Sequence, residues 1–173
     1  QAREICLEQA AFLRWCQHEV VGLMNQRFWL DELLEKIKMP EKWLNKPYFV
    51  HSYGCLNFVV HGIYNRYGGW YSGHPADIFP SKRTMIAAEV LKLSGTKQLM
   101  DKAQELLSMC NPQLALHMID FVVNGTMEKT DRKKSLILKS KILDARAQIE
   151  TNGMAKNTFL RGAEAAEQEA NNL

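Results

Sequence analysis

The residue types that could support catalysis or metal binding are spread thinly along this chain. A hydrolytic metal site needs clustered histidine, cysteine, aspartate or glutamate side chains. No two histidines stand two or four positions apart, and the sequence contains no serine-centred nucleophile elbow. The histidines are His18, His51, His61, His74 and His117. The sequence therefore predicts no catalytic residue, no metal ligand and no cofactor in this chain.

Two pairs with helical spacing could still bring polar side chains together. Cys55 follows His51 by four residues, about one helical turn, so a thiol and an imidazole could meet there. The apolar surroundings favour an inert buried thiol over a reactive one. His61 and Asn65 have the same spacing, and we interpret them as a hydrogen-bonded pair.

The stretch from His51 to Pro80 predicts an apolar helix followed by a glycine-broken aromatic turn. At about 100° per residue, Tyr53, Val60, Tyr64 and Tyr67 fall along one stripe of this helix. Gly54, Phe58 and Gly62 fall along a second stripe, and its two glycines let another backbone approach closely. Core or dimer packing is expected for Gly54, Phe58, Gly62 and Tyr64. A helix that is apolar nearly all round belongs inside a protein or between two protein surfaces.

The residues after this helix, 68–75, cannot continue it. Their glycines free the backbone, and Pro75 lacks a backbone donor. Trp70 and Tyr71 in such a turn form either a buried plug or a wall of a pocket. Burial is the commoner reason for aromatic residues in a turn, which favours the plug.

Composition excludes several classes of protein. The chain has 173 residues with 46% hydrophobic and 24% charged residues, which is typical of a folded domain. Its net charge of +3 gives no electrostatic reason to bind nucleic acid. No run approaches the roughly 20 apolar residues of a membrane span. The chain begins at Gln1 without an initiator methionine, which indicates a processed product or part of a longer protein.

The cysteines show no C-x-x-C pairing and are interpreted as buried free thiols, which favours a reducing compartment such as the cytoplasm. They are Cys6, Cys16, Cys55 and Cys110.

Hydrophobic periodicity predicts an all-α fold over the whole chain, 1–173, as a single domain with an N-terminal half, 1–80, and a C-terminal half, 81–173. The expected helices are 2–26, 31–39, the central helix, 81–93, 96–110, 112–125, 131–150 and 157–171. We expect Ser81, Thr96, Asn111 and Asp131 to cap helices, and the last helix to fray. Apolar residues expected to point inward include Ile86, Leu93 and Ile149.

The C-terminal half also shows a repeat-like spacing. Thr96 and Asp131 are thirty-five positions apart, close to the roughly 34-residue period of paired-helix repeats. This predicts one tetratricopeptide-like hairpin plus a following helix. The basic run 129–141 is interpreted as a solvated helix face, or otherwise as a surface for an acidic partner.

Several motifs resemble the dimerisation domain of alkyl sulfatases, the helical region that follows a metallo-β-lactamase-type catalytic domain. They are Tyr53-Gly54, Tyr64-Asn65-Arg66-Tyr67, Gly69-Trp70-Tyr71, Gly73-His74-Pro75-Ala76, the short helix 31–40 and the closing motif 156–164. The resemblance covers nearly the whole chain. It departs at Asn57-Phe58-Val59, where bacterial members tend to carry Ser-His-Asn, and at Lys156, where an arginine is usual.

The resemblance implies a module that is non-catalytic alone, pairs with its copy in a homodimer and covers the two-zinc site of its parent, an enzyme that hydrolyses alkyl sulfate esters. Its partners would be the upstream catalytic domain and the alkyl sulfate substrate. The substrate-binding candidates carried over are Tyr53, Tyr67, Trp70, Tyr71, Lys156, Asn157 and Arg161. Tyrosine hydroxyls and cations can donate to sulfate oxygens. Core packing of the tyrosines and a plain surface charge at Arg161 are the structural alternatives.

Two other functions remain open at this point. A stand-alone helical adaptor could have kept the fold without a catalytic partner, as the repeat-like hairpin and the departures at Phe58 and Lys156 suggest. A module that binds lipid or alkyl chains could be built on the aromatic turn.

Overall fold

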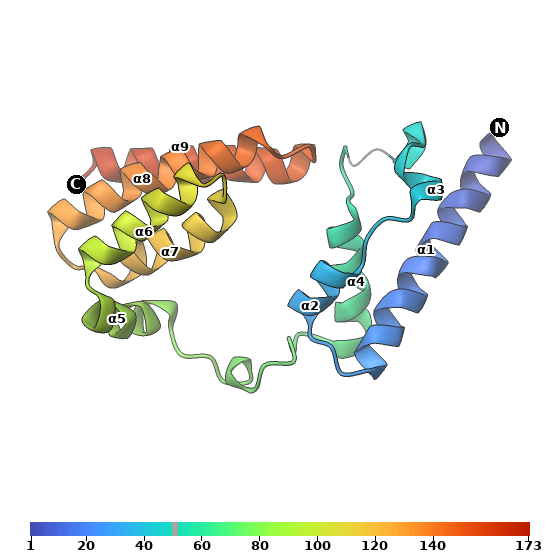
Figure 1. Ribbon diagram of the computed structural model, residues 1–173, viewed down its shortest axis with the longest axis horizontal. Coiled ribbons are helices and arrows are strands. Elements are labelled where there is room, and N and C mark those ends of the chain that lie inside the picture. The colour runs from blue at the N-terminus through green and yellow to red at the C-terminus, as the bar shows by residue number, and fades with distance from the viewer. Residues whose placement is uncertain (50–51) are drawn as a thin grey trace. The chain divides into compact units, whose positions relative to one another are not determined.

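The chain folds into helices that form two compact units. The computed structural model describes residues 1–49 and 52–173, which contain helices and no strand (Figure 1). The expected all-α fold class is confirmed. The N-terminal unit is Gln1–Pro80 and the C-terminal unit is Ser81–Leu173. The interpretation of the whole chain as a single domain stays a prediction.

The N-terminal unit is built on the packing of α1 against α4, and α2 also contacts α4 (Figure 1). Its elements are α1 (Ala2–Asn25), α2 (Leu30–Lys36), α3 (Glu41–Leu44), the 3-10 turn η1 (Pro47–Phe49), α4 (Leu56–Gly68) and the 3-10 turn η2 (Pro75–Asp77). The Phe12 ring packs edge-on against Trp43 and Phe49, with centroids 5.3 and 5.1 Å apart. Burial of these aromatic rings and of the α1 and α4 apolar stripes holds the unit together.

The C-terminal unit places α7 at its centre, in contact with α5, α6 and α8, and α9 packs along α8. Its elements are α5 (Arg83–Ser94), α6 (Thr96–Ser108), α7 (Pro112–Gly125), α8 (Lys129–Gln148) and α9 (Gly153–Asn171). Ile119 and Ile142 are fully buried in its core. Ala170 is also buried, at 1% exposure, and α9 continues to Asn171. Small alanines let this end of α9 pack closely, and the expected fraying stays a prediction.

The helix starts follow the sequence only in part. The side chain of Asn111 accepts a hydrogen bond from the Leu114 amide at 3.2 Å, which confirms this cap. The other expected caps are wrong, because the helices begin elsewhere: α5 begins at Arg83, two residues after Ser81, and Thr96 is the first residue of its helix. Asp131 lies inside α8. The tetratricopeptide-like character of α6 and α7 stays a prediction.

Several apolar residues expected inside the fold face solvent. Leu93 is 90% exposed, Ile149 is 63% exposed and Ile86 is 45% exposed. Ile149 terminates α8 as its C-cap. α5 has apolar residues around most of its circumference, so their periodicity does not distinguish its inner side from its outer side.

The four cysteines are free thiols as expected, but the expected burial holds for only one of them. Cys16 is fully buried, and burial raises the pKa of its thiol to about 11, which makes it unreactive at neutral pH. Cys6 and Cys110 are exposed and Cys55 is half-buried. The expected contact of Cys55 with His51 lies outside the described residues, and the pairing of His61 with Asn65 stays a prediction.

The basic run on α8 is partly paired within its own unit. Arg132 contacts Glu169 at 2.6 Å, and Lys139 contacts Asp120 at 2.7 Å. Lys133 and Lys134 remain exposed. The interpretation as a solvated face therefore applies to only some of these side chains. Among the described residues, no helix is both long enough and apolar enough to cross a membrane.

Candidate functional site

The aromatic turn after α4 is shaped by two glycines with left-handed backbone. Gly69 ends α4 with φ 67°, and Gly73 has φ 104°. A Cβ atom on Gly73 would lie 2.6 Å from Cδ1 of Trp29, closer than real Cβ contacts come. Only glycine satisfies both the backbone angle and the contact with the indole ring. The turn is therefore fixed against Trp29, the N-cap residue of α2.

Hydrogen bonds and ring contacts hold the rest of the turn in place. The hydroxyl of Tyr64 donates to the carbonyl of Ser72, and the hydroxyl of Tyr71 donates to the carbonyl of Gly73, both at 2.9 Å. The His74 ring packs edge-on against Trp29, with centroids 3.8 Å apart, and its Nε2 lies 3.7 Å from a carboxylate oxygen of Asp31. Tyr64, an expected packing residue, thus closes the core and positions the turn.

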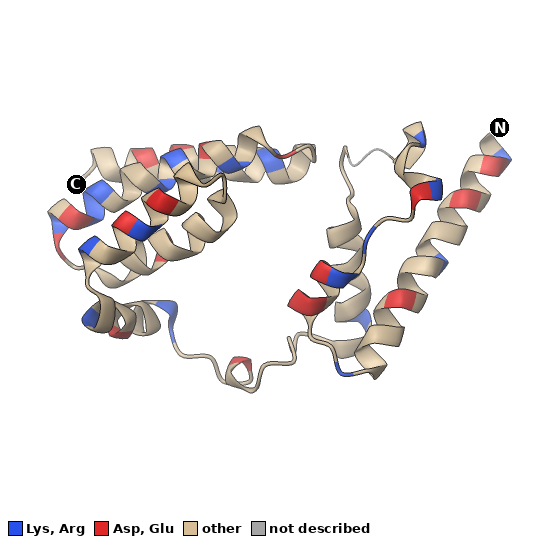
Figure 2. Cartoon of the chain, viewed as in Figure 1, with Lys and Arg blue, Asp and Glu red and all other residues tan. Residues whose placement is uncertain are grey.

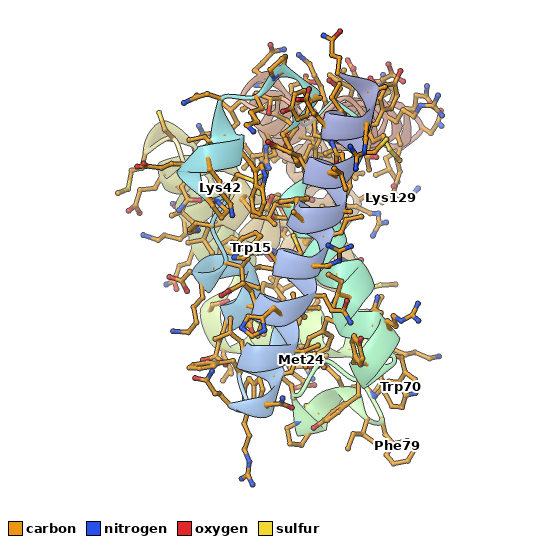
Figure 3. The ribbon with its side chains drawn as sticks, turned by 90° about the vertical axis from the view of Figure 1, so that its right-hand side faces the viewer. Trp15, Met24, Lys42, Trp70, Phe79 and Lys129 are labelled. Atoms are coloured by element: carbon orange, nitrogen blue, oxygen red, sulfur yellow. The ribbon has the colours of Figure 1, made fainter. Side chains whose placement is uncertain are left out.

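This scaffold leaves Trp70 in solvent. Its side chain is 74% exposed, and Tyr71 beside it is half-buried. The buried-plug interpretation is therefore wrong for Trp70, because Tyr64 and Trp29 already fill the space under the turn. In Figure 3 the side chains of Trp70 and Phe79 project away from the ribbon, and Phe79 is 91% exposed. These rings are available to a partner or a ligand.

The tyrosine candidates are at opposite ends of α4. Tyr53 precedes the first residue of the helix, and its ring is 77% exposed. Tyr67 lies in the last turn, is 51% exposed and accepts a hydrogen bond from the side chain of Gln17 on α1. A helix rises about 1.5 Å per residue, so Tyr53 and Tyr67 are roughly 16 Å or more apart along the axis of α4. Tyr53 is thus not brought together with Tyr67 and Trp70, and the expectation that it lies on the helix is wrong.

The closing-motif candidates lie on α9, whose start is well defined. The Asn152 side chain caps α9 by accepting from the Ala155 amide at 2.9 Å. Glu150 accepts from the Asn152 amide at 2.9 Å and from the Arg146 guanidinium at 2.8 Å. The Arg146 guanidinium also lies 4.7 Å from the centroid of the Phe159 ring. These contacts fix the register of α9 against α8.

Asn157 and Arg161 are one helical turn apart on α9, and both are exposed. An amide and a guanidinium with this spacing can donate to the same anion. Lys156 is half-buried on the neighbouring stripe. These residues belong to the C-terminal unit and the aromatic candidates belong to the N-terminal unit.

The contacts of Glu150 predict a pH dependence of stability. Burial opposes ionisation of its carboxyl group, but the hydrogen bonds from the Asn152 amide and from Arg146 outweigh burial and hold its pKa below the ordinary value. The stabilisation is complete above the ordinary glutamate pKa and is lost as pH falls through the depressed folded-state value. We expect Glu150→Gln to lower the free energy of unfolding by about 1–2 kcal/mol at pH 7.

Urea unfolding followed by far-ultraviolet circular dichroism between pH 7 and pH 3 measures this effect. The difference between wild type and Glu150→Gln should shrink as pH falls. Glu167→Gln, which changes an exposed carboxylate on α9, is the matched control and should show little difference at any pH. If Glu150→Gln lowered the free energy of unfolding by the same amount at every pH, the ionised Glu150 carboxylate would not be the source of the stabilisation.

The outer face of α4 is a second candidate surface, and its composition is unusual. Leu56, Val60 and Tyr64 are buried, and Phe58 and Gly62, on the opposite face, are exposed. A Cβ atom on Gly62 would meet nothing within 4 Å. A glycine inside a helix costs roughly 1 kcal/mol relative to alanine. The structure of this unit gives no packing reason for it.

A shallow groove lines the contact between α1 and α4. One hollow lies between Phe12, Leu13, Leu56 and Val59. Another is lined by Leu13, Gln17, Val59, Ile63, Arg66 and Tyr67. Leu7 and Leu13 on α1 are 56% and 50% exposed. Sequence analysis missed Leu7 and Gln17, and the signal that could have found Leu7 is the wide spread of apolar residues around α1.

A metal site is not formed by the described part of the chain. In residues 1–49 and 52–173, no three His, Cys, Asp or Glu side chains are grouped so that they could hold an ion. The described residues therefore do not fit the zinc ions that the family resemblance implies for a parent enzyme, and no chemical step is assigned to zinc in this chain.

An all-helical fold with exposed aromatic rings and an uncovered, nearly uncharged helix face has the character of a protein-interaction module. The chain belongs to the alkyl sulfatase dimerisation family, whose model matches residues 30–169. The resemblance drawn from the sequence motifs is confirmed.

Known proteins similar to this chain are alkylsulfatases. It is 24% identical over 167 residues to a linear primary-alkylsulfatase of Pseudomonas sp., covering 95% of this chain and 24% of that protein. A linear primary-alkylsulfatase of Pseudomonas sp. (strain ATCC 19151) is 32% identical over 84 residues, 48% of this chain and 16% of the relative. The chain thus spans about a quarter or less of the length of these curated relatives.

The fold is similar to that of a solved enzyme. The structure of the stereoselective inverting sec-alkylsulfatase from Pseudomonas sp. matches with a TM-score of 0.81 at 19% identity, over 89% of this chain and 24% of that chain. At this identity the match establishes the fold alone.

Proposed function

We propose that this chain is the dimerisation and active-site-covering module of an alkyl-sulfatase-like zinc metallohydrolase of the metallo-β-lactamase superfamily. In this proposal the chain forms a homodimer and is non-catalytic alone. A neighbouring catalytic domain would hold the zinc, which would activate a water molecule there. Residues of this chain bind and orient the alkyl sulfate ester.

The observation that carries the proposal is the exposure of Trp70 on a turn that is otherwise rigidly held. A tryptophan kept 74% exposed by glycines, hydrogen bonds and ring contacts is available to cover an apolar ligand or a partner. Membership of the dimerisation family supports pairing with a second copy. The alkylsulfatase relatives support an alkyl sulfate ester as substrate.

The candidate residues divide between two roles in this proposal. Tyr67, Trp70 and Tyr71 would offer apolar rings to the alkyl chain, Tyr67 and Trp70 could also donate to the ester through a hydroxyl and an indole N–H, and the role of Tyr53 stays a prediction. Lys156, Asn157 and Arg161 would donate to the sulfate oxygens. Donation to a charged oxygen is worth about 1.5–3 kcal/mol per hydrogen bond.

Light scattering coupled to size-exclusion chromatography tests the dimerisation part. We expect the 173-residue chain to be a dimer at high micromolar concentration. A strict monomer would count against the proposal. A dodecyl sulfate assay with added zinc should detect no turnover by the chain alone, and turnover would overturn its non-catalytic role.

A chimera tests the covering role. This chain would replace the matching part of the linear primary-alkylsulfatase of Pseudomonas sp. that it resembles over 95% of its length. We expect Arg161→Ala in an active chimera to lower kcat/KM for dodecyl sulfate at least tenfold, because a charge-assisted hydrogen bond to the sulfate group is lost. Lys133→Ala, an exposed lysine on α8, is the control. Equal effects of the two substitutions would contradict the assignment of Arg161.

The adaptor alternative makes the opposite prediction for the chimera. A helical adaptor without a role over a reaction centre would give no loss of kcat/KM on Arg161→Ala, even if the chain still dimerises. The two measurements together therefore separate dimerisation from active-site covering.

A further inference from the structure

The outer face of α4 is exposed in the N-terminal unit, but its composition is not that of a solvent-facing helix surface. Its centre is formed by Phe58, Gly62 and Asn65, which point away from the buried Val60 and Tyr64 at about 100° per residue. Phe58 is 44% exposed, and no atom lies within 4 Å of a Cβ built on Gly62. Within the described part of the N-terminal unit, this face is uncovered.

The charge pattern of α4 indicates a protein partner rather than solvent. Arg66 is the only Asp, Glu, Lys or Arg in Leu56–Gly68. By contrast, α1 in the same unit carries charges along its length (Figure 2). A helix that faces water on one side normally has charged residues on that side. The nearly neutral outer face of α4 is therefore suited to burial.

The position of Gly62 indicates how close the partner comes. Gly62 lies in the middle of α4, where glycine weakens a helix. No helix of the same unit uses the missing side chain to approach. A glycine at the centre of a neutral face lets a second helix cross it at short distance.

We propose that α4 pairs with α4 of a second copy of this chain in an antiparallel crossing centred on Gly62. This rests on the proposed dimerisation and names the surface that performs it. Two-fold symmetry requires one patch that is complementary to itself. In the crossing Gly62 faces Gly62 of the second copy, and each Phe58 packs beside the opposite Asn65.

The position of Arg66 is compatible with this symmetry. In an antiparallel pair the two Arg66 side chains stand at opposite ends of the contact, about 12 Å apart along the helix axis at 1.5 Å per residue. Like charges do not meet at the centre, and each guanidinium stays at the rim, where it is hydrated. A parallel pair would place the two arginines side by side.

Substitution at Gly62 separates this inference from the proposed function. Gly62→Leu adds a side chain where the monomer has open space and favours the helix, so the fold should be retained. We expect the dimer dissociation constant of the full chain to rise at least tenfold, measured by sedimentation equilibrium. Asn57→Leu, at a position on the flank of α4 that is also exposed, should change the dissociation constant less than twofold.

The outcomes are distinct. A wild-type chain that remains a monomer at high micromolar concentration defeats dimerisation itself, and the α4 pairing with it. A wild-type dimer whose dissociation constant is unchanged by Gly62→Leu defeats only the pairing through α4. That second result would indicate that another part of the protein covers this face.

Cross-linking provides a measurement that does not depend on affinity. In a chain with Cys6→Ser, Cys55→Ser and Cys110→Ser, oxidation of the Gly62→Cys variant should give a covalent dimer on a non-reducing gel. A disulfide requires Cα atoms about 4.4–6.8 Å apart, which the crossing point provides. The Asn57→Cys variant should remain a single chain. A covalent dimer of Asn57→Cys without one of Gly62→Cys would overturn the proposed crossing.

Discussion

Replacing Gly73 by alanine should destabilise the N-terminal unit by about 2–4 kcal/mol. Two independent costs add at this position. Its φ of 104° is a backbone conformation that a residue with a Cβ rarely adopts, and the new methyl group would lie 2.6 Å from Trp29. Relief of the clash requires the turn or the Trp29 indole to move, which would also disturb the contact of His74 with Trp29.

Urea unfolding followed by tryptophan fluorescence measures this loss in the N-terminal unit alone. All four tryptophans, Trp15, Trp29, Trp43 and Trp70, belong to that unit. Gly54→Ala is the matched control, because Gly54 is exposed, has open space around its Cβ and does not adopt the left-handed φ. Similar midpoints for Gly73→Ala and wild type would show that Trp29 does not fix the turn.

Truncation of Ile142 should have a comparably large effect in the C-terminal unit. Its side chain is 0% exposed in the centre of the core. Ile142→Ala removes buried methyl and methylene groups and leaves a cavity, which typically costs 2–5 kcal/mol. The same substitution at Ile137 on α8, where the side chain is 43% exposed, should cost less than about 1 kcal/mol and serves as the control.

Two optical signals report this second prediction. Far-ultraviolet circular dichroism follows the helices of both units, and tryptophan fluorescence follows only the N-terminal unit. We expect Ile142→Ala to lower the dichroism midpoint of the C-terminal unit and to leave the fluorescence midpoint in place, because the two cores have no residue in common. Equal shifts in both signals would mean that the units unfold as one.

The fold class could be predicted from the sequence because apolar periodicity and local start signals agree over most of the chain. Asn111 followed by Pro112 is the clearest case, since cap and proline act through the backbone of the same turn. Ser81 and Asp131 failed as caps because a polar residue can cap in isolation, but packing decides where a helix begins. Close packing is such a long-range constraint on α5: a Cβ on Gly125 of α7 would lie 2.7 Å from the backbone of Ala87.

The candidate site could be predicted only as a set of residues, without its geometry. The motif around Trp70 was recognisable, but its exposure depends on Trp29, which is distant in sequence and fills the space beneath the turn. Likewise, one helical stripe could not separate Tyr53 from Tyr67, because α4 starts after Tyr53. Long-range contacts decide these points, and a local pattern contains no information about them.

The short connection between η2 and α5 has a further consequence for a pair of chains. Residues 78–82 connect η2 to α5 across the boundary between the two units, and at 3.3–3.6 Å per residue they span no more than about 18 Å. A dimer that forms through the N-terminal units therefore also keeps the two C-terminal units close to each other. Their effective concentration is then on the order of millimolar. An affinity between C-terminal units too weak to assemble free fragments would then be sufficient to complete the assembly.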